Sequence, residues 1–83
     1  MGVKLKSLSG EDVVAIFERF GFLAIAQTGS HVKLRRMNSQ IVETLIIPSH
    51  STISKGTLKA IFNQSTRYIP SQELRDYFFS AER

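Results

Sequence analysis

The chain has 83 residues, enough for one domain with a modest core, and its 42% hydrophobic and 22% charged content is typical of a globular protein. The absence of cysteine excludes disulfides, thiolate metal sites and a thiol nucleophile, and it suits a reducing cytoplasm. The net charge of +4 lies in residues 21–62, which hold five Lys or Arg and one Glu. Such a localised basic patch favours a polyanionic partner, although an ordinary soluble surface explains it equally well.

The first regular element predicted is a helix over 10–20. Ser9 is a good N-cap, apolar residues follow at helical spacing, and Gly21 is suited to end the helix in a left-handed conformation. We expect residues 1–7 to be a polar lead-in. They resemble no signal peptide, and no apolar run in the chain is long enough to span a membrane.

A three-stranded meander is predicted next. The expected strands are 22–27, 31–36 and 41–47, joined by turns at 28–30 and 37–40. Gly29 can adopt the positive φ that a hairpin turn often needs. Alternation along the middle strand places His31, Lys33 and Arg35 on one face. Pro48 ends the ladder because it has no N–H to donate.

Two further helices are predicted over 55–65 and 72–81, the second capped by Ser71. Each of the first two helices has a single apolar stripe, which can be buried only against the sheet. We therefore expect an α+β sandwich, α-β-β-β-α with an additional C-terminal helix, like a double-stranded-RNA-binding domain. Residues 1–83 form one domain in this interpretation.

The expected middle strand, residues 31–36, contains the candidate catalytic residue and several candidate phosphate-binding residues. His31 can move a proton near neutral pH, and it shares a face with cations that attract phosphate. The candidate phosphate-binding residues are Lys33, Arg35, Arg36, Lys55 and Lys59. For Lys55 and Lys59, a solvated helix face is the simpler interpretation; beside a basic strand, phosphate contact is about equally well supported.

Three segments together resemble the HicA family of type II toxin–antitoxin systems. Gly21-Phe22 closes the first helix, and Gln27-Thr28-Gly29-Ser30-His31 is close to the family's Gln-x-Gly-Ser-His. Ile47-Pro48-Ser49-His50, followed by Lys55-Gly56-Thr57-Leu58, is close to the family's Pro-x-His and Gly-Thr-Leu stretches. The resemblance covers about residues 8–65. Residues 66–83, a C-terminal helical extension, lie beyond the usual end of these toxins.

The resemblance implies a double-stranded-RNA-binding-like fold and cleavage of messenger RNA without metal or cofactor, with His31 as the catalytic residue. It also implies a HicB-like antitoxin as protein partner. We assign His31 as general base, or as a base-and-acid shuttle, with Lys33 and Arg35 stabilising the developing charge. We expect no role for a membrane.

Several roles stay open at this point. His50 could be an acid partner, an RNA contact or a residue that pins its loop, and we favour the last two. Ser30 is an auxiliary candidate only, because no Asp–His pair is placed to activate it as a nucleophile. The stripe of Leu74, Tyr77 and Phe78 is expected in the core; the alternative is a dimer or antitoxin surface with Phe79 exposed.

Two other functions compete with that of a nuclease. A non-catalytic RNA-binding module of the same fold would bind RNA through its cations and would not need His31. A protein-binding subunit would use the basic patch to dock an acidic partner and would have no affinity for RNA.

Overall fold

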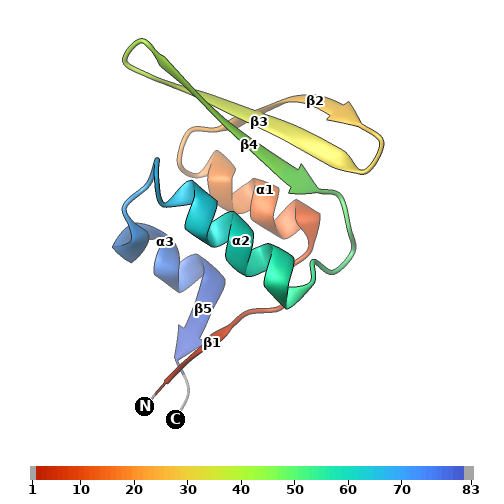
Figure 1. The fold of residues 1–83 in the computed structure, drawn as a ribbon, viewed down its shortest axis with the longest axis vertical. Helices are drawn as coiled ribbons and strands as arrows, with labels where there is room; N and C mark the ends of the chain where they lie inside the picture. The colour runs from red at the N-terminus through yellow and green to blue at the C-terminus, as the bar shows by residue number, and fades with distance from the viewer. Residues whose placement is uncertain (1, 82–83) are drawn as a thin grey trace.

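Eight regular elements are ordered along residues 2–81, the part of the chain that this computed structural model describes (Figure 1). In chain order they are β1 (Val3–Leu5), α1 (Gly10–Glu18), β2 (Leu23–Thr28), β3 (His31–Asn38), β4 (Ile41–Pro48), α2 (Lys55–Ser65), α3 (Ser71–Phe78) and β5 (Phe79–Ala81). β2, β3 and β4 form an antiparallel sheet in that order, and β1 pairs with β5 in a separate two-stranded sheet. This arrangement confirms the predicted α+β sandwich with an additional C-terminal helix.

α1 and α2 cover one face of the three-stranded sheet (Figure 1). We call this covered side the inner face and the opposite side the outer face. The core between the layers joins Phe17 of α1, Leu34 and Leu45 of the sheet and Leu58 of α2, all of which are buried. Leu74 of α3 belongs to the same cluster. The helix beyond residue 66 is therefore part of the core and not an appendage.

Local signals explain most element boundaries. The predicted cap of α1 is confirmed as a full capping box, in which Ser9 Oγ accepts from the Asp12 N–H and the Asp12 carboxylate accepts from the Ser9 N–H. Gly21 and Gly29 both have positive φ, as expected for the end of the helix and for the hairpin turn. In the second hairpin the positive φ falls on Ser39, within a turn of two residues.

Both ends of the chain differ from the prediction. Residues 3–5 were expected to lack regular structure but form β1, and residues 79–81 were expected to be helical but form β5. Val3 pairs with Ala81 and Leu5 with Phe79. The pairing draws residues 79–81 out of the helix because it supplies their backbone with partners.

Smaller boundary predictions were also wrong. α1 ends at Glu18 rather than at residue 20, and β3 continues through Asn38 rather than ending at 36. Ser71 is the first residue of α3 and does not cap it, because Pro70 occupies the N-cap position. Phe79 is half-buried with its ring 5.1 Å from that of Phe62, so the core interpretation of this stripe is the one observed.

Gly10 sets the distance between α1 and the end of β4. Its N–H donates to the carbonyl of His50 at 2.8 Å. A Cβ built on Gly10 would overlap the carbonyl oxygen of Pro48 and crowd the backbone of Ser49. Only glycine therefore lets the first turn of α1 lie directly against residues 49–54, the connector between β4 and α2.

We expect Gly10→Ala to destabilise the fold by about 1–3 kcal/mol, because either α1 or the connector must move to relieve the overlap. The measurement is thermal unfolding followed by circular dichroism. Gly56→Ala is the matched control, since Gly56 also lies in the first turn of a helix but has open space around it. An equal melting temperature for G10A and G56A would contradict this account.

Candidate functional site

The β2–β3 hairpin brings His31 to the end of the sheet. Gly29 closes the turn with φ of 59°, and His31 opens β3 opposite Thr28 on one side and Pro48 on the other. The carbonyl of Ser30 accepts a hydrogen bond from the N–H of Ser49. The hairpin turn is thus tied to the connector after β4, and the His31 side chain remains exposed.

Three predicted site residues share the outer face of β3. Val32 and Leu34 point inward, where Leu34 is fully buried, so His31, Lys33 and Arg35 point outward by alternation. Neighbours on one face of a strand are separated by about 6.6 Å at the backbone. His31 and Lys33 are therefore close enough to contact one nucleotide of an RNA chain.

Arg36 does not belong to this group, although we predicted it among the RNA-binding cations. Its side chain lies on the inner face, and its Nε donates to Glu43 Oε1 at 2.7 Å. Its other two nitrogens donate to the carbonyls of Phe20 and Tyr68, at 2.8 and 3.0 Å, and its guanidinium lies 4.8 Å from the ring centre of Phe22. These contacts engage every nitrogen of the guanidinium in holding the fold together.

Glu43 is the carboxylate partner of Arg36 and is 5% exposed. Burial by itself raises the pKa of Glu43, but hydrogen bonds from Arg36 and Asn38, together with the positive charge of Arg36, outweigh it. The net effect is a pKa below the ordinary value of 4.5. The ionised form is therefore the one that the fold stabilises.

The lysines of α2 lie on the other side of the sheet from Lys33 and Arg35, since α2 packs on the inner face (Figure 1). Lys55 Nζ donates to the carbonyl of Leu5 at 2.8 Å and to Ser7 Oγ at 3.3 Å, which fastens the segment after β1 to the start of α2. Lys59 is exposed one turn further along. The predicted cations thus fall into separate groups rather than one continuous patch.

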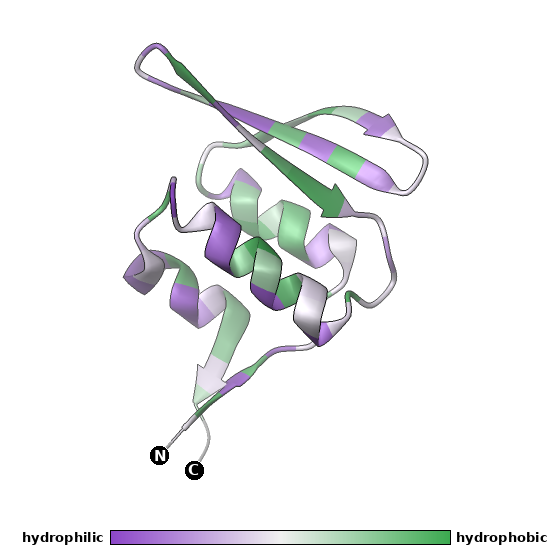
Figure 2. Cartoon of the chain, in the orientation of Figure 1, coloured by the Kyte–Doolittle hydropathy of each residue, from purple (hydrophilic) through white to green (hydrophobic). Residues whose placement is uncertain are grey.

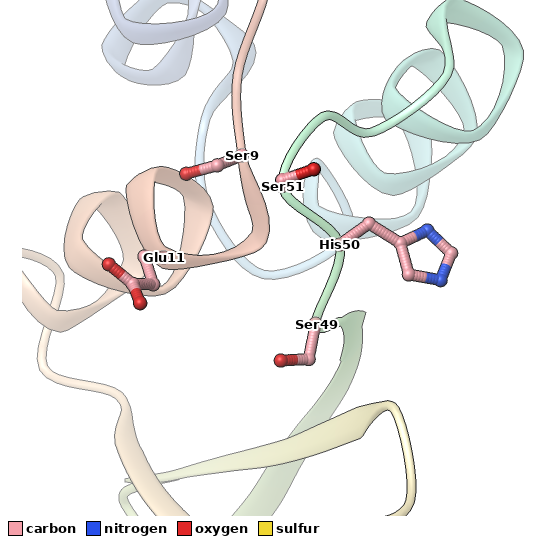
Figure 3. A pocket seen from close by; sticks show the side chains of 5 residues that line it. All are labelled: Ser9, Glu11, Ser49, His50 and Ser51. Atoms are coloured by element: carbon pink, nitrogen blue, oxygen red, sulfur yellow. The ribbon is translucent and has the colours of Figure 1, made fainter.

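A pair of shallow hollows lies beside the connector, with volumes of about 430 and 410 Å³. Glu11 and Ser49 line both, and Gln27 lines the second together with Val32. Figure 3 shows the Ser49 hydroxyl directed to the side of the connector on which α1 and Glu11 lie, whereas the His50 ring extends to the other side. Sequence reasoning missed Glu11 here, because an acidic residue in the first turn of a helix is explained by the helix dipole.

Residues 2–81 contain neither a cluster of metal ligands nor a helix that could span a membrane. In that range, no three His, Asp or Glu side chains are gathered as metal ligands. No described helix has both the length and the apolar character required to cross a bilayer.

One comparison with known proteins gave a match. The family described as HicA toxin of bacterial toxin-antitoxin matches residues 10–66, which run from the start of α1 to the end of α2. The match therefore includes the whole meander, the hairpin turn with His31 and the connector with His50. Comparisons with curated proteins and with solved structures gave no significant match.

The Arg36–Glu43 pair generates a prediction about stability. We expect Glu43→Gln to lower the free energy of unfolding by about 3 kcal/mol at pH 7, because the substitution leaves a half-buried guanidinium without its counter-ion. The folded-state pKa of Glu43 is depressed, so its contribution is present above the ordinary value and is lost as pH falls through the folded value.

The measurement is urea unfolding of parent and E43Q from pH 7 down to pH 3. The difference between the two stabilities should shrink as the pH falls below the ordinary pKa of a carboxyl, because Glu43 of the unfolded parent then binds a proton that the folded state resists. A constant difference across this range would contradict the assignment of the charge to Glu43.

Proposed function

The chain belongs to the HicA family of bacterial toxins, whose members are ribonucleases, and from this premise we propose that it cleaves messenger RNA with His31 as the catalytic residue. The observation that supports the proposal is the exposure of His31 at the end of an outer strand face that also carries Lys33 and Arg35. Glycine and serine immediately before His31 keep the approach to its ring free of bulky side chains.

RNA supplies its own nucleophile, so the demands on the protein are small. In our proposal the His31 imidazole removes the proton of a 2′-hydroxyl, and the 2′-oxygen forms a bond to the adjacent phosphorus. The bond from phosphorus to the 5′-oxygen then breaks, and that oxygen takes a proton from the imidazolium. The products are a 2′,3′-cyclic phosphate and a 5′-hydroxyl, and no metal or cofactor is required.

Lys33 and Arg35 support this reaction by charge. Negative charge accumulates on the non-bridging oxygens as the phosphorus becomes five-coordinate, and fixed cations on the same face stabilise it. We place Ser30 and His50 outside the proton transfers. The contact that the structure shows for His50 is made by its backbone carbonyl, which accepts from Gly10, and this supports a role in holding the connector.

Regulation completes the proposal. A toxin of this family is made with an antitoxin, and we propose a HicB-like protein that neutralises the nuclease in the cytoplasm. Lys55 and Lys59 lie on the side of the sheet opposite to His31, so in our proposal the RNA contacts of these two lysines fall outside the cleavage position.

We expect His31→Ala to reduce the rate of RNA cleavage by at least about 100-fold, because positioned proton transfer is worth ~10²–10⁴. Purified protein is incubated with RNA in EDTA, and the cyclic-phosphate ends are quantified. His50→Gln is the matched control and should cleave within a few fold of the parent.

Equal cleavage by H31A and parent would contradict the assignment of His31. Intact RNA with the parent protein, together with a shifted band on a native gel, would favour the non-catalytic RNA-binding module instead.

The double variant K33A/R35A should bind RNA more weakly, and its binding should depend less on salt. Each lost phosphate contact lowers the slope of log affinity against log salt by about 1. The measurement is fluorescence anisotropy with a labelled RNA, using H31A protein so that the RNA stays intact. K4A is the control for the loss of one exposed positive charge outside this face, and an unchanged slope for the double variant would remove these two cations from the proposed site.

A further inference from the structure

The second of the two hollows beside the connector has a volume of about 410 Å³ and plays no part in the proposed proton transfers. Its size falls within the range of about 300–1,000 Å³ that is usual for small-ligand sites. We call it the α1 hollow, because it opens beside the first turn of α1. Its lining comes from α1, β2, β3 and the connector, and consists of Gly10, Glu11, Val14, Gln27, Val32 and Ser49.

Two valines form the apolar part of this lining. Val32 points to the inner face of the sheet, and Figure 2 shows the alternation of hydrophilic and hydrophobic residues along β3 that places it there. Val14 of α1 packs against the same core, and both valines are half-buried. The open part of each side chain therefore faces the hollow. Apolar side chains of this kind give the flat ring of a nucleobase a surface to lie against.

Three hydrogen-bonding side chains complete the lining, and each comes from a different element. Gln27 pairs with Val32 across the β2–β3 ladder, so the two side chains share the inner face. Glu11 lies in the first turn of α1, and the Ser49 hydroxyl is directed to the side of the connector on which Glu11 lies (Figure 3). The close approach of α1 to the connector at Gly10 brings the three groups around one hollow.

The carboxylate of Glu11 is free to bind a ligand. The capping box of α1 uses Asp12 and leaves the neighbouring Glu11 without a hydrogen bond or an ion pair among residues 2–81. The helix dipole favours a carboxylate at this end of α1, but it does not account for the presence of Gln27 and Ser49 beside it. A few polar groups that converge on a partly apolar hollow are typical of a ligand site.

The α1 hollow lies at the same end of the sheet as the proposed site of cleavage. Val32 follows His31 in β3, and the N–H of Ser49 donates to the carbonyl of Ser30 in the hairpin turn. The His31 side chain and the hollow are therefore on opposite faces, with the turn between them. A Cβ added at Gly29 would meet no atom within 4 Å, so the surface of the turn is open to an RNA chain that passes around it.

The charge of Glu11 decides which part of an RNA the hollow accepts. A carboxylate repels phosphate and accepts hydrogen bonds from the N–H groups of a base. Guanine has two adjacent donors on its Watson–Crick edge, N1–H and the 2-amino group, which match the two oxygens of one carboxylate. Adenine and cytosine present one amino group beside a ring nitrogen that accepts. Uracil places its one N–H between two carbonyl oxygens, so the hollow favours guanine over the other three bases.

We propose that the α1 hollow binds a guanine base of single-stranded RNA. The Glu11 carboxylate accepts from N1–H and from the 2-amino group, and Gln27 and Ser49 donate to the acceptors O6 and N7. Binding of the base positions a neighbouring phosphodiester at His31; this consequence rests on the proposed function. Glu11 is thus a specificity-determining residue and takes no part in proton transfer.

The test compares guanosine with inosine, which lacks only the 2-amino group. Two labelled RNAs of adenine and uracil carry one or the other at a single central position. They are titrated by fluorescence anisotropy with H31A protein, so that the RNA stays intact. We expect H31A to bind the guanosine RNA at least about tenfold more tightly than the inosine RNA, because one of the paired hydrogen bonds to the carboxylate is lost.

Glu11→Gln, introduced into H31A, should reduce this preference to within about twofold, because an amide presents one acceptor where the carboxylate presents two. Glu18→Gln is the matched control, since Glu18 is also an exposed glutamate of α1 but does not line the hollow. It should keep the full preference. Gln27→Ala should weaken the binding of both RNAs equally, because guanine and the base of inosine share O6 and N7.

Equal affinity of H31A for the two RNAs would overturn the proposal, and so would a preference that survives in H31A/E11Q. Tighter binding of both RNAs by H31A/E11Q, with no change in their ratio, would show that Glu11 only repels phosphate, which also overturns it. Melting curves confirm that each variant is folded before it is titrated.

Cleavage by the chain with His31 intact separates this proposal from the proposed function. Cut sites mapped on an RNA of mixed sequence should lie at a fixed distance from guanosines, and E11Q should lose this pattern. Cleavage without any preference for guanine would leave the nuclease function standing and overturn the guanine site. Preferential binding of the guanosine RNA by a chain that does not cleave would leave the site standing and overturn the nuclease function.

Discussion

The side chain of Arg36 connects three segments that are far apart in the sequence. It joins the middle strand to Glu43 of β4, to the end of α1 through Phe20 and to the turn before α3 through Tyr68. A guanidinium can do this because its donors lie in one rigid plane and can bind three acceptors at once. The strand that carries His31 is thereby fixed to the segments that follow α1 and α2.

This inward position also determines what the outer face contains. Side chains alternate along a strand, so with Arg36 on the inner face, Arg35, Lys33 and His31 must lie on the other. A shift of β3 by one residue would send these cations into the core and expose Leu34. The buried ion pair thus keeps the basic face on the solvent side, although Arg36 is itself no part of that face.

The central part of the fold was readable from local signals. The cap of α1, the glycines after α1 and in the first hairpin turn, and the alternation of β3 are decided by neighbouring residues, and each was predicted correctly. The pairing of β1 with β5 was not predicted, because strands of three residues have no measurable periodicity and their partners lie more than 70 residues apart. Local propensity over 79–81 favoured a helix, and a tertiary contact overrode it.

For the candidate site, the sequence predicts which residues share a strand face. It does not predict which groups from distant parts of the chain lie close to those residues in the fold. The grouping of His31, Lys33 and Arg35 followed from alternation alone. The inward role of Arg36 depends on carbonyls of Phe20 and Tyr68, whose positions no sequence pattern encodes. The placement of Glu11 beside Ser49 likewise arises only when α1 closes on the connector at Gly10.

The two-stranded sheet of β1 and β5 has a practical geometric result. It lies at the pole of the molecule farthest from the three-stranded sheet, with the helices between them (Figure 1). An affinity tag, a fluorophore or a surface tether joined beyond either strand would therefore emerge on the side away from His31. Immobilised or fused forms of the protein would present the hairpin end to solvent, whichever end of the chain carried the attachment.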